Sequence, residues 1–242
     1  MAFSDDEVER YARHLVLAEV GGPGQQALKR ARVLVGGVGA PAALYLAAAG
    51  VGTLGLIDDD VVALSNLQRQ ILFATADVGR AKVEAARDRL AGLNPHVAIQ
   101  TFAERLTPEN AARLIADFDL VLDGTDDFAT RHTVNAACVA AGKPLVSGAL
   151  GRWSGQVGVF AGRPCYQCLT PEVPPDAETC ARVGVVGALA GVIGSMAALE
   201  TIKWIVGAGQ SLQGRLLIYD GLAGTARTVR IAPDPACPVC GG

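Results

Sequence analysis

The sequence predicts an α/β fold in which a mostly parallel, doubly wound sheet is extended by antiparallel strands. Through residues 31–150 short apolar segments alternate with helical ones, a rhythm typical of parallel sheets covered by helices. After Trp153 the alternation stops, and three further strands are predicted around one apolar helix, at 156–160, 215–219 and 225–231. We therefore expect a single domain over 1–242, with N-terminal helices at 1–30, a first half at 31–150 and a second half at 151–242.

Composition and charge exclude several classes of function. The formal net charge of −3 offers no basic surface for nucleic acid. The first residues lack the basic and apolar regions of a signal peptide, so we expect a cytoplasmic protein whose six cysteines are thiols or metal ligands. Residues 183–199 carry no charge, but they include four glycines and continue into Glu200–Lys203. This favours a buried, closely packed helix over a membrane span.

The N-terminal segment begins with a helix signal. Ser4 and Glu7 form a capping box, in which each side chain satisfies the free backbone N–H group of the other residue. The helix is expected to run to about Glu19 and to stop at Gly21–Gly24, before a short helix that ends at Arg30.

A glycine-rich turn, 36–39, follows the first predicted strand, 33–35, and leads into an apolar helix at 40–49. Such a turn presents backbone N–H groups and the positive end of the helix dipole to an anion, so Gly37 and Gly39 are expected to bind phosphate. The pattern Gly37-x-Gly39-x-x-Ala42 matches a looser dinucleotide fingerprint, which makes the predicted sheet Rossmann-like, although the pattern alone also fits an ordinary tight turn. The next strand, 53–57, ends in Asp58, where an acid commonly holds ribose hydroxyls.

Further elements complete the first half. They are a helix at 79–93, a strand at 97–102, a helix from 107, a strand at 120–122, a helix at 131–141 and a strand at 145–147. Lys82 lies in the first turn of its helix, where it opposes the helix dipole, so a local anion explains it better than helix stability does. Asp123–Asp127 directly follow a strand. Because ligands bind beyond the carboxyl ends of parallel strands, the glycine turn, Asp58 and Asp126 are expected to converge.

The cysteines form two groups. Two CxxC pairs supply four thiolates with the local spacing of a tetrahedral zinc site: Cys165, Cys168, Cys237 and Cys240. A closed shell of four thiolates has no open position, so we expect a structural zinc knuckle of four cysteines that pins the C-terminal strand. Cys138 lies in an apolar helix and is expected in the core. Cys180 lies beside Arg182 in a polar stretch, which fits a reactive thiol and an inert loop thiol equally.

Several motifs together resemble one family. They are Arg10–His14, Ser65–Gln70, Gly79–Val83, Asp123–Asp127, Pro164–Cys168 and Cys237–Gly241. On these residues the chain resembles the E1-like adenylyltransferases of the ThiF/MoeB/HesA family over nearly its whole length. It is more similar to the member that activates molybdopterin synthase than to the thiamin member. The run Ser-Asn-Leu-Gln-Arg-Gln and the paired cysteine motifs are the most diagnostic.

The resemblance implies ATP-dependent adenylation of the C-terminal Gly-Gly carboxylate of a small β-grasp, ubiquitin-like sulfur-carrier protein. Pyrophosphate is released, and the carrier is prepared for thiocarboxylate formation. Residues 31–150 would bind the nucleotide and residues 151–242 the carrier. The implied roles are ribose binding by Asp58, triphosphate binding by Asn66, Arg69 and Lys82, Mg²⁺ binding by Asp126, insertion of Arg13 into the partner's active site within a homodimer, and sulfur transfer at Cys180, which some members use.

Two departures from the family pattern leave alternatives open. The turn lacks the leading Gly-x of the family's Gly-x-Gly-Gly-x-Gly, and Asp127 stands where many members carry asparagine. The shortened turn is the main support for one alternative, a degenerate carrier-binding adaptor with weak or no ATP binding. A nicotinamide-dependent oxidoreductase explains the turn and Asp58 but leaves the nearby cations without a role, and a related tRNA-modifying dehydratase branch usually lacks the paired cysteines. No sulfurtransferase domain follows Gly242, so a separate sulfur donor protein is expected.

Overall fold

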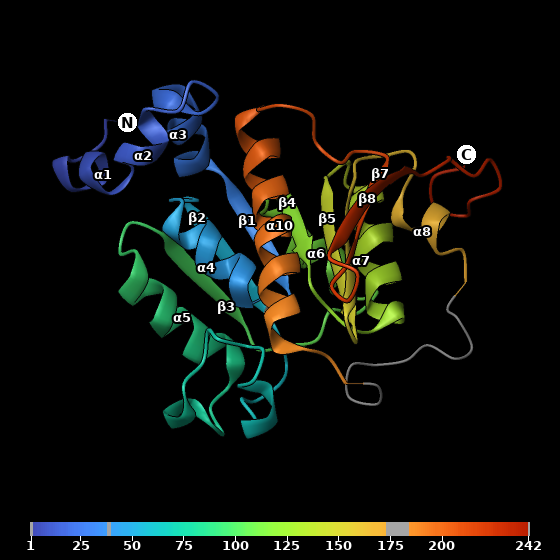
Figure 1. Cartoon of the computed structure of the whole chain (residues 1–242), viewed down its shortest axis with the longest axis horizontal. Coiled ribbons are helices and arrows are strands. Elements are labelled where there is room, and N and C mark those ends of the chain that lie inside the picture. The colour runs from blue at the N-terminus through green and yellow to red at the C-terminus, as the bar shows by residue number, and fades with distance from the viewer. Residues whose placement is uncertain (1, 38–39, 173–183, 242) are drawn as a thin grey trace.

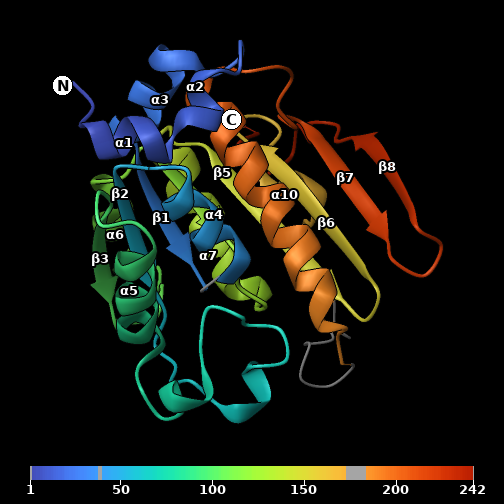
Figure 2. The same cartoon turned by 60° about the vertical axis from the view of Figure 1, so that its left-hand side comes forward.

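A single eight-stranded sheet crosses the whole molecule in the computed structural model, which describes residues 2–37, 40–172 and 184–241 (Figures 1 and 2). The strand order is β3-β2-β1-β4-β5-β6-β7-β8. Neighbours pair in parallel from β3 to β5 and antiparallel from β5 to β8. The strands are β1 (Arg32–Gly36), β2 (Thr53–Ile57), β3 (Ala98–Phe102), β4 (Leu120–Asp123), β5 (Leu145–Gly151), β6 (Ser154–Phe160), β7 (Arg215–Asp220) and β8 (Thr225–Arg230). The predicted fold class is confirmed.

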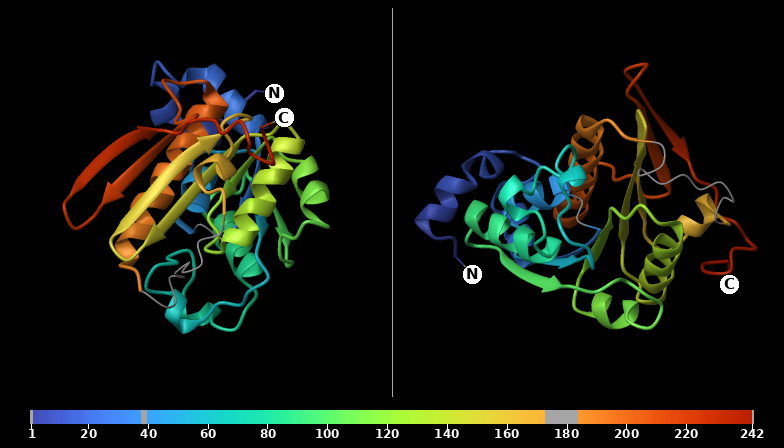
Figure 3. Two further views of the ribbon diagram at one scale, coloured as in Figure 1. Left: turned by 90° about the vertical axis from the view of Figure 1, so that its right-hand side faces the viewer. Right: turned by 90° about the horizontal axis from the view of Figure 1, so that it is seen from below.

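Helices cover both faces of the sheet, and each face has its own apolar core. One core joins the sheet to α4, α5 and α10, and the other joins it to α6, α7 and α8. The view from below shows these layers on opposite sides of the strands (Figure 3). The helices are α1 (Asp5–Arg10), α2 (Ala12–Leu15), α3 (Gly21–Arg30), α4 (Ala40–Ala48), α5 (Lys82–Leu93), α6 (Ala111–Ala116), α7 (Phe128–Ala140), α8 (Tyr166–Leu169) and α10 (Gly187–Val206).

The central strand β1 explains where a ligand site forms. Val33, Leu34 and Val35 are fully buried, as expected of a parallel strand covered on both faces. β1 pairs with β2 on one side and with β4 on the other. The strand order therefore reverses at β1, and in such sheets the crevice at the carboxyl ends next to this reversal accepts ligands.

The N-terminal helices differ from the prediction. The capping box of Ser4 and Glu7 forms, but the helix does not continue to Glu19, because α1 and α2 are separated at Tyr11. The Tyr11 ring is buried, and its hydroxyl accepts a hydrogen bond from Nδ2 of Asn94 at 2.9 Å. This tertiary contact outweighs continuous helix formation.

The glycine-rich stretch after α2 also differs from the prediction. Gly21–Gly24 were expected to stop a helix, but they form the first turn of α3. Pro23 is tolerated there because the backbone N–H groups of the first helical turn have no partner within the helix.

Three other helix boundaries were misplaced. α5 begins at Lys82 rather than at Gly79, which has a φ of +91° and is unsuited to a helix. α7 begins earlier than expected, at Phe128, because the Asp127 side chain accepts hydrogen bonds from the next backbone N–H groups. α6 begins later, at Ala111, after a turn in which the Asn110 side chain accepts from the backbone N–H of Thr107.

The long helix α10 lies beside α4 over the sheet (Figure 1). It passes a test of length and composition for a membrane span, with a mean hydropathy of 1.5. The expected close packing is confirmed, since a Cβ on Gly194 would lie 3.1 Å from Pro41. The expectation of a buried helix was wrong for much of its length, because only 33% of its most apolar stretch is buried and Leu199 is 57% exposed.

Candidate active site and metal centre

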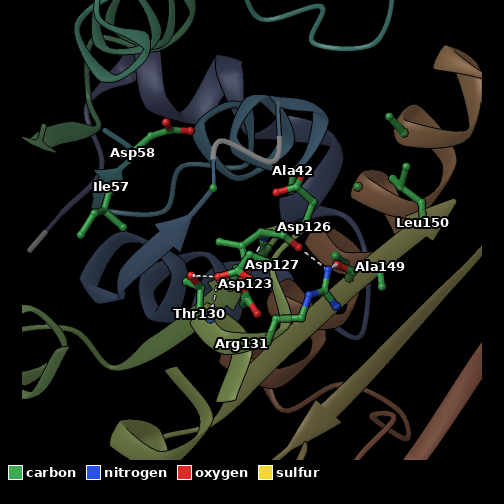
Figure 4. Close-up of a pocket in the computed structure, with 18 of the residues that line it drawn as sticks. Ala42, Ile57, Asp58, Asp123, Asp126, Asp127, Thr130, Arg131, Ala149 and Leu150 are labelled. Atoms are coloured by element: carbon green, nitrogen blue, oxygen red, sulfur yellow. Dashed lines mark hydrogen bonds between the residues drawn. The ribbon is translucent and has the colours of Figure 1, made fainter. Parts of the chain in front are cut away.

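A cavity of about 440 Å³ lies at the carboxyl ends of the parallel strands (Figure 4). Its wall combines residues that follow β1, β2 and β4 with the far end of β5 and one side of α10. Predicted site residues in the wall are Gly37, Asp58, Asn66, Arg69, Lys82 and Asp126. The structure therefore brings together predicted residues that lie far apart in the sequence.

Gly37 closes the turn after β1. Its φ is +55°, and a Cβ there would lie 2.9 Å from the backbone of Thr125, so only glycine fits. Its N–H donates to the carbonyl oxygen of Ile57 at 3.2 Å. Gly37 is thus packed tightly against the end of β2 and the loop that follows β4. Gly39, the other predicted glycine, lies outside the described residues.

Lys82 is held by carboxylates of the loop after β2. Only 5% of Lys82 is exposed, and its Nζ lies 2.7 Å from Asp60 and 3.6 Å from Asp58. These two acids supply the anion that the lysine's position in the first helical turn predicts. A phosphate bound in the cavity would share the Lys82 ammonium with these carboxylates.

Asn66 and Arg69 come from the loop after Asp60, which contains a short 3-10 turn over Leu64–Asn66. Oδ1 of Asn66 accepts the N–H of Ala63 at 3.1 Å and so fixes the turn. The Arg69 guanidinium donates to the Ser65 carbonyl at 3.2 Å, and no carboxylate lies within 4.0 Å of it in the described parts of the chain. Among the described residues, Arg69 therefore presents a positive charge without a carboxylate partner to the cavity.

The end of β4 and the loop that follows it contribute three acids in three different environments. Asp123 is 1% exposed, and its Oδ1 accepts from the N–H and the hydroxyl of Thr125 at 2.9 and 2.7 Å. Its Oδ2 has no hydrogen-bond partner within the described residues. A buried carboxylate oxygen without a donor is costly, which is expected where a ligand or cation completes the site. Asp126 is exposed at the cavity wall.

Asp127 has a structural role. Its carboxylate caps α7 by accepting from the N–H and hydroxyl of Thr130 at 2.9 and 2.6 Å. The hydroxyl bond is the largest of the contributions that hold the pKa of Asp127 below its ordinary value, with burial opposing and backbone N–H groups assisting. Asparagine caps helices equally well, so the departure from the family pattern at this position is conservative.

Arg131 was missed by the sequence analysis. It is 6% exposed, lines the cavity, and donates to the carbonyl oxygens of Thr125 and, at 3.1 Å, Gly148. Burial disfavours its charge, but the neighbouring Asp123 and Tyr166 raise the pKa of Arg131 above its ordinary value. The available signal was a basic residue in the first turn of a helix that follows an acidic strand end, as for Lys82.

Two residues with predicted roles lie elsewhere. Arg13 is exposed on α2 and is not part of the described cavity wall. Its predicted role in a partner's active site needs a second copy of the chain and stays a prediction. Cys180 lies outside the described residues.

The four predicted metal ligands come together beside α7, whose Asn135 contacts Cys165. Their Sγ atoms all lie within 4.8 Å of one another, with 3.7 Å between Cys165 and Cys237 and 3.4 Å between Cys168 and Cys240. Zinc–sulfur bonds of about 2.3 Å in a tetrahedron place sulfurs about 3.8 Å apart, so the cluster fits a zinc ion. All five described cysteines are free thiols.

Hydrogen bonds from the surrounding chain reach two of the cluster's sulfurs, although burial raises the pKa of Cys165 and raises the pKa of Cys240 to about 12. Nδ2 of Asn135 donates to Sγ of Cys165, and the backbone N–H of Asp234 donates to Sγ of Cys168, both at 3.5 Å. Burial opposes ionisation of Cys237, but backbone N–H groups of Cys240 and Val239 lower its pKa to about 7. Such second-layer hydrogen bonds orient metal ligands. Outside the cluster, burial raises the pKa of Cys138 to about 12, and this buried thiol belongs to the core as predicted.

Comparison with known proteins identifies the family. The ThiF family profile matches residues 11–239. The chain is 48% identical to molybdopterin-synthase adenylyltransferase of Escherichia coli over 98% of both chains. It is 45% identical to the sulfur carrier protein adenylyltransferase of Thermus thermophilus, covering all of this chain and 93% of that protein. It is 49% identical to the probable adenylyltransferase/sulfurtransferase MoeZ of Mycobacterium tuberculosis, of which it spans 63%.

Solved structures share the fold. PaaA has a TM-score of 0.81 at 26% identity, with 95% of this chain and 75% of PaaA covered. Escherichia coli MccB with ATP has a TM-score of 0.81 at 23% identity, with 98% of this chain and 75% of MccB covered. The expected resemblance is confirmed, and the chain belongs to the ThiF family.

Proposed function

We propose that this chain uses ATP to adenylate the C-terminal Gly-Gly carboxylate of a small ubiquitin-like sulfur-carrier protein. The observation that carries the proposal is the gathering of Asp58, Arg69, Lys82 and Asp126 around one cavity at the carboxyl ends of the sheet. The family and the names of the relatives that match this chain at 45–49% identity support the same activity.

The reaction places demands on charge that this cavity meets. The carboxylate oxygen of the carrier attacks the α-phosphorus of ATP, a new O–P bond forms, and the bond from the α-phosphorus to the pyrophosphate oxygen breaks. An anion attacks an anion, so the step needs countercharge and positioning, and it requires no proton transfer. Arg69 and Lys82 supply cations where pyrophosphate develops, and Asp58 lies where ribose hydroxyls bind.

Acids in the same wall provide a place for Mg²⁺. Asp126 is exposed to the cavity, and Asp123 has an oxygen without a partner among the described residues. Hard carboxylate oxygens of this kind suit magnesium. When bound, the ion would neutralise phosphate charge. Zinc is proposed at the four cysteines, where a closed thiolate shell gives it a structural role.

The apolar face of α10 supports a homodimer. Leu199 on α10 and Tyr45 on the adjacent α4 are 57% and 55% exposed, although α10 is strongly apolar. A second copy covering this face would remove the apolar surface from water. In such a dimer, the exposed Arg13 is the residue proposed to reach the partner's cavity. Free thiols suit the cytoplasm, and a separate protein would donate sulfur, with Cys180 as the candidate transfer residue.

The adaptor hypothesis keeps one supporting feature, the shortened glycine turn. The cations and acids around the cavity support an active enzyme over an adaptor. The nicotinamide hypothesis has no use for Arg69, Lys82 and Asp126, and family membership argues against it. The dehydratase branch is disfavoured by the complete cysteine cluster.

ATP–pyrophosphate exchange tests the proposal. The chain is incubated with ATP, Mg²⁺ and labelled pyrophosphate, with a Gly-Gly-ended carrier, with the same carrier lacking its last glycine, and without carrier. Exchange that requires the intact carrier supports adenylation. Carrier binding without exchange would support the adaptor, and reduction of a nicotinamide cofactor would support the oxidoreductase.

A further inference from the structure

One helix connects the cavity to the cysteine cluster. α7 carries Asp127 at its N-cap, Arg131 one turn later and Asn135 one turn beyond that. A spacing of four residues places these side chains along one face of the helix. Arg131 lines the cavity, whereas Asn135 contacts Cys165. About 6 Å of rigid helix therefore separates a residue of each site.

Asn135 uses both ends of its amide on the cluster. It is 1% exposed, Nδ2 donates to Sγ of Cys165 at 3.5 Å, and Oδ1 accepts the N–H of Tyr166 at 2.8 Å. A buried amide with both ends engaged has one orientation. It therefore fixes Cys165 and Tyr166 to α7.

Tyr166 belongs to both sites. It directly follows Cys165, begins α8, and is 2% exposed, yet it forms part of the cavity wall. Its ring packs edge-to-face on Phe160 and on His132 of α7, with centroids 5.5 and 6.1 Å away. Arg131 lines the same cavity.

Arg131 completes the connection. Its guanidinium donates to the carbonyl oxygens of Thr125 and Gly148, and so ties the loop that carries Asp126 to β5 (Figure 4). A shift of Tyr166 or α7 would displace this guanidinium. Cys165, Asn135, Tyr166 and Arg131, which lead from the cluster to the acidic loop, are all buried.

We propose that Asn135 and Tyr166 are positioning residues that couple the four-cysteine site to the reaction cavity. A divalent cation at the thiolates and a magnesium-bound adenine nucleotide in the cavity then strengthen each other's binding. Such coupling is reciprocal, so each ligand changes the affinity of the other by the same factor. The inference rests on the proposed function, because it assigns the cavity to a nucleotide.

The test measures zinc release from the zinc-loaded chain. A chromogenic chelator reports release with and without α,β-methylene-ATP and Mg²⁺, and calorimetry measures nucleotide binding separately. In the wild type we expect the nucleotide to slow release by about five-fold or more. In the converse experiment, removal of zinc weakens nucleotide binding by a similar factor.

Two variants separate coupling from simple structural support. Tyr166→Phe keeps the ring and every metal ligand, so release without nucleotide stays at the wild-type rate while the nucleotide effect falls below about two-fold. Asn135→Asp keeps an acceptor for Tyr166 but loses the donor to Cys165, so release is faster even without nucleotide. Thr133→Ala on the same helix is the control, because the Thr133 hydroxyl donates only to the carbonyl of Ala129 among the described residues.

Each other outcome overturns the inference. Tyr166→Phe with the wild-type nucleotide effect removes the tyrosine from the role. Wild-type chain that binds the nucleotide without any change in zinc release refutes the coupling but leaves the proposed function intact. Failure of the nucleotide to bind at all refutes both. A chain that takes up no zinc refutes the coupling alone.

Discussion

The cavity and the cysteine cluster are built in opposite ways. The cluster consists of two short CxxC motifs, whose spacing in the sequence is typical of tetrahedral metal sites. The cavity draws on single residues after β1, β2 and β4, and their proximity depends on strand order. One site is therefore encoded locally and the other by topology. The difference implies that substitutions in the cluster act on stability, and substitutions in the cavity act on chemistry.

The largest expected effect is on the cavity. Arg69→Ala removes a cation that has no carboxylate partner in the described chain, so folding loses little while pyrophosphate exchange falls by about a hundred-fold or more. Exchange kinetics and thermal unfolding measure the two effects. Arg87→Ala, a half-buried arginine paired with Glu84 and Asp88 on α5, is the matched control and should keep full exchange. Normal exchange in Arg69→Ala would remove this residue from the site.

Substitutions in the cysteine cluster are expected to lower the stability of the fold, whereas Arg69→Ala lowers the exchange activity. Cys240→Ser leaves three thiolates, and the free energy of unfolding falls by more than about 3 kcal/mol because metal binding is part of folding. Urea unfolding at fixed zinc concentration measures the loss, and metal analysis shows less bound zinc. Cys138→Ala, a core cysteine outside the cluster, should keep its zinc. A Cys240→Ser chain of wild-type stability would contradict a structural metal.

A third region, the exposed apolar face of α10 around Leu199, is expected to affect formation of the dimer. Leu199→Glu places a charge on an apolar face that we propose to be buried between two copies. The expected result is loss of the dimer in light scattering, and loss of exchange if Arg13 acts across the interface. Leu222→Glu, at another exposed leucine in the turn before β8, is the control. A Leu199→Glu dimer as stable as wild type would place the interface elsewhere.

The smallest expected effect concerns the cap of α7. Because the pKa of Asp127 is lowered in the folded chain, its carboxylate stabilises the fold above the unfolded pKa of about 3.9. That stability is lost as the pH falls through the folded value. Asp127→Asn keeps the cap and should change neutral-pH stability by less than about 0.5 kcal/mol. Unfolding measured from pH 7 to pH 3 should show a shallower acid loss in the variant, and an unchanged acid loss would contradict this role.

Local patterns predicted the fold well. Apolar strands, the capping box of Ser4 and the motifs after β2 and β4 each indicate their structure within a few residues. The boundaries of α1 and α2 failed because Tyr11 bonds to Asn94, which lies far along the chain. No local pattern contains such a contact.

The site was only partly predictable for the same reason. Asp58, Lys82 and Asp126 were predicted as site residues because Asp58 and Asp126 follow strands and Lys82 lies in the first turn of a helix. Arg131 was missed because its importance comes from Thr125 and Gly148, which meet it only in the folded sheet. The place of Tyr166 between the cysteine cluster and the cavity could not be predicted either. The sequence shows that Tyr166 follows Cys165, but not that it lines the cavity.

A crystal structure of the chain with α,β-methylene-ATP and Mg²⁺ tests the central claim most directly. We predict the ribose at Asp58, the phosphates within hydrogen-bond reach of Arg69 and Lys82, and the metal ion on the acidic loop that carries Asp126. A nucleotide bound elsewhere, or one whose phosphates lie away from both cations, would contradict the account.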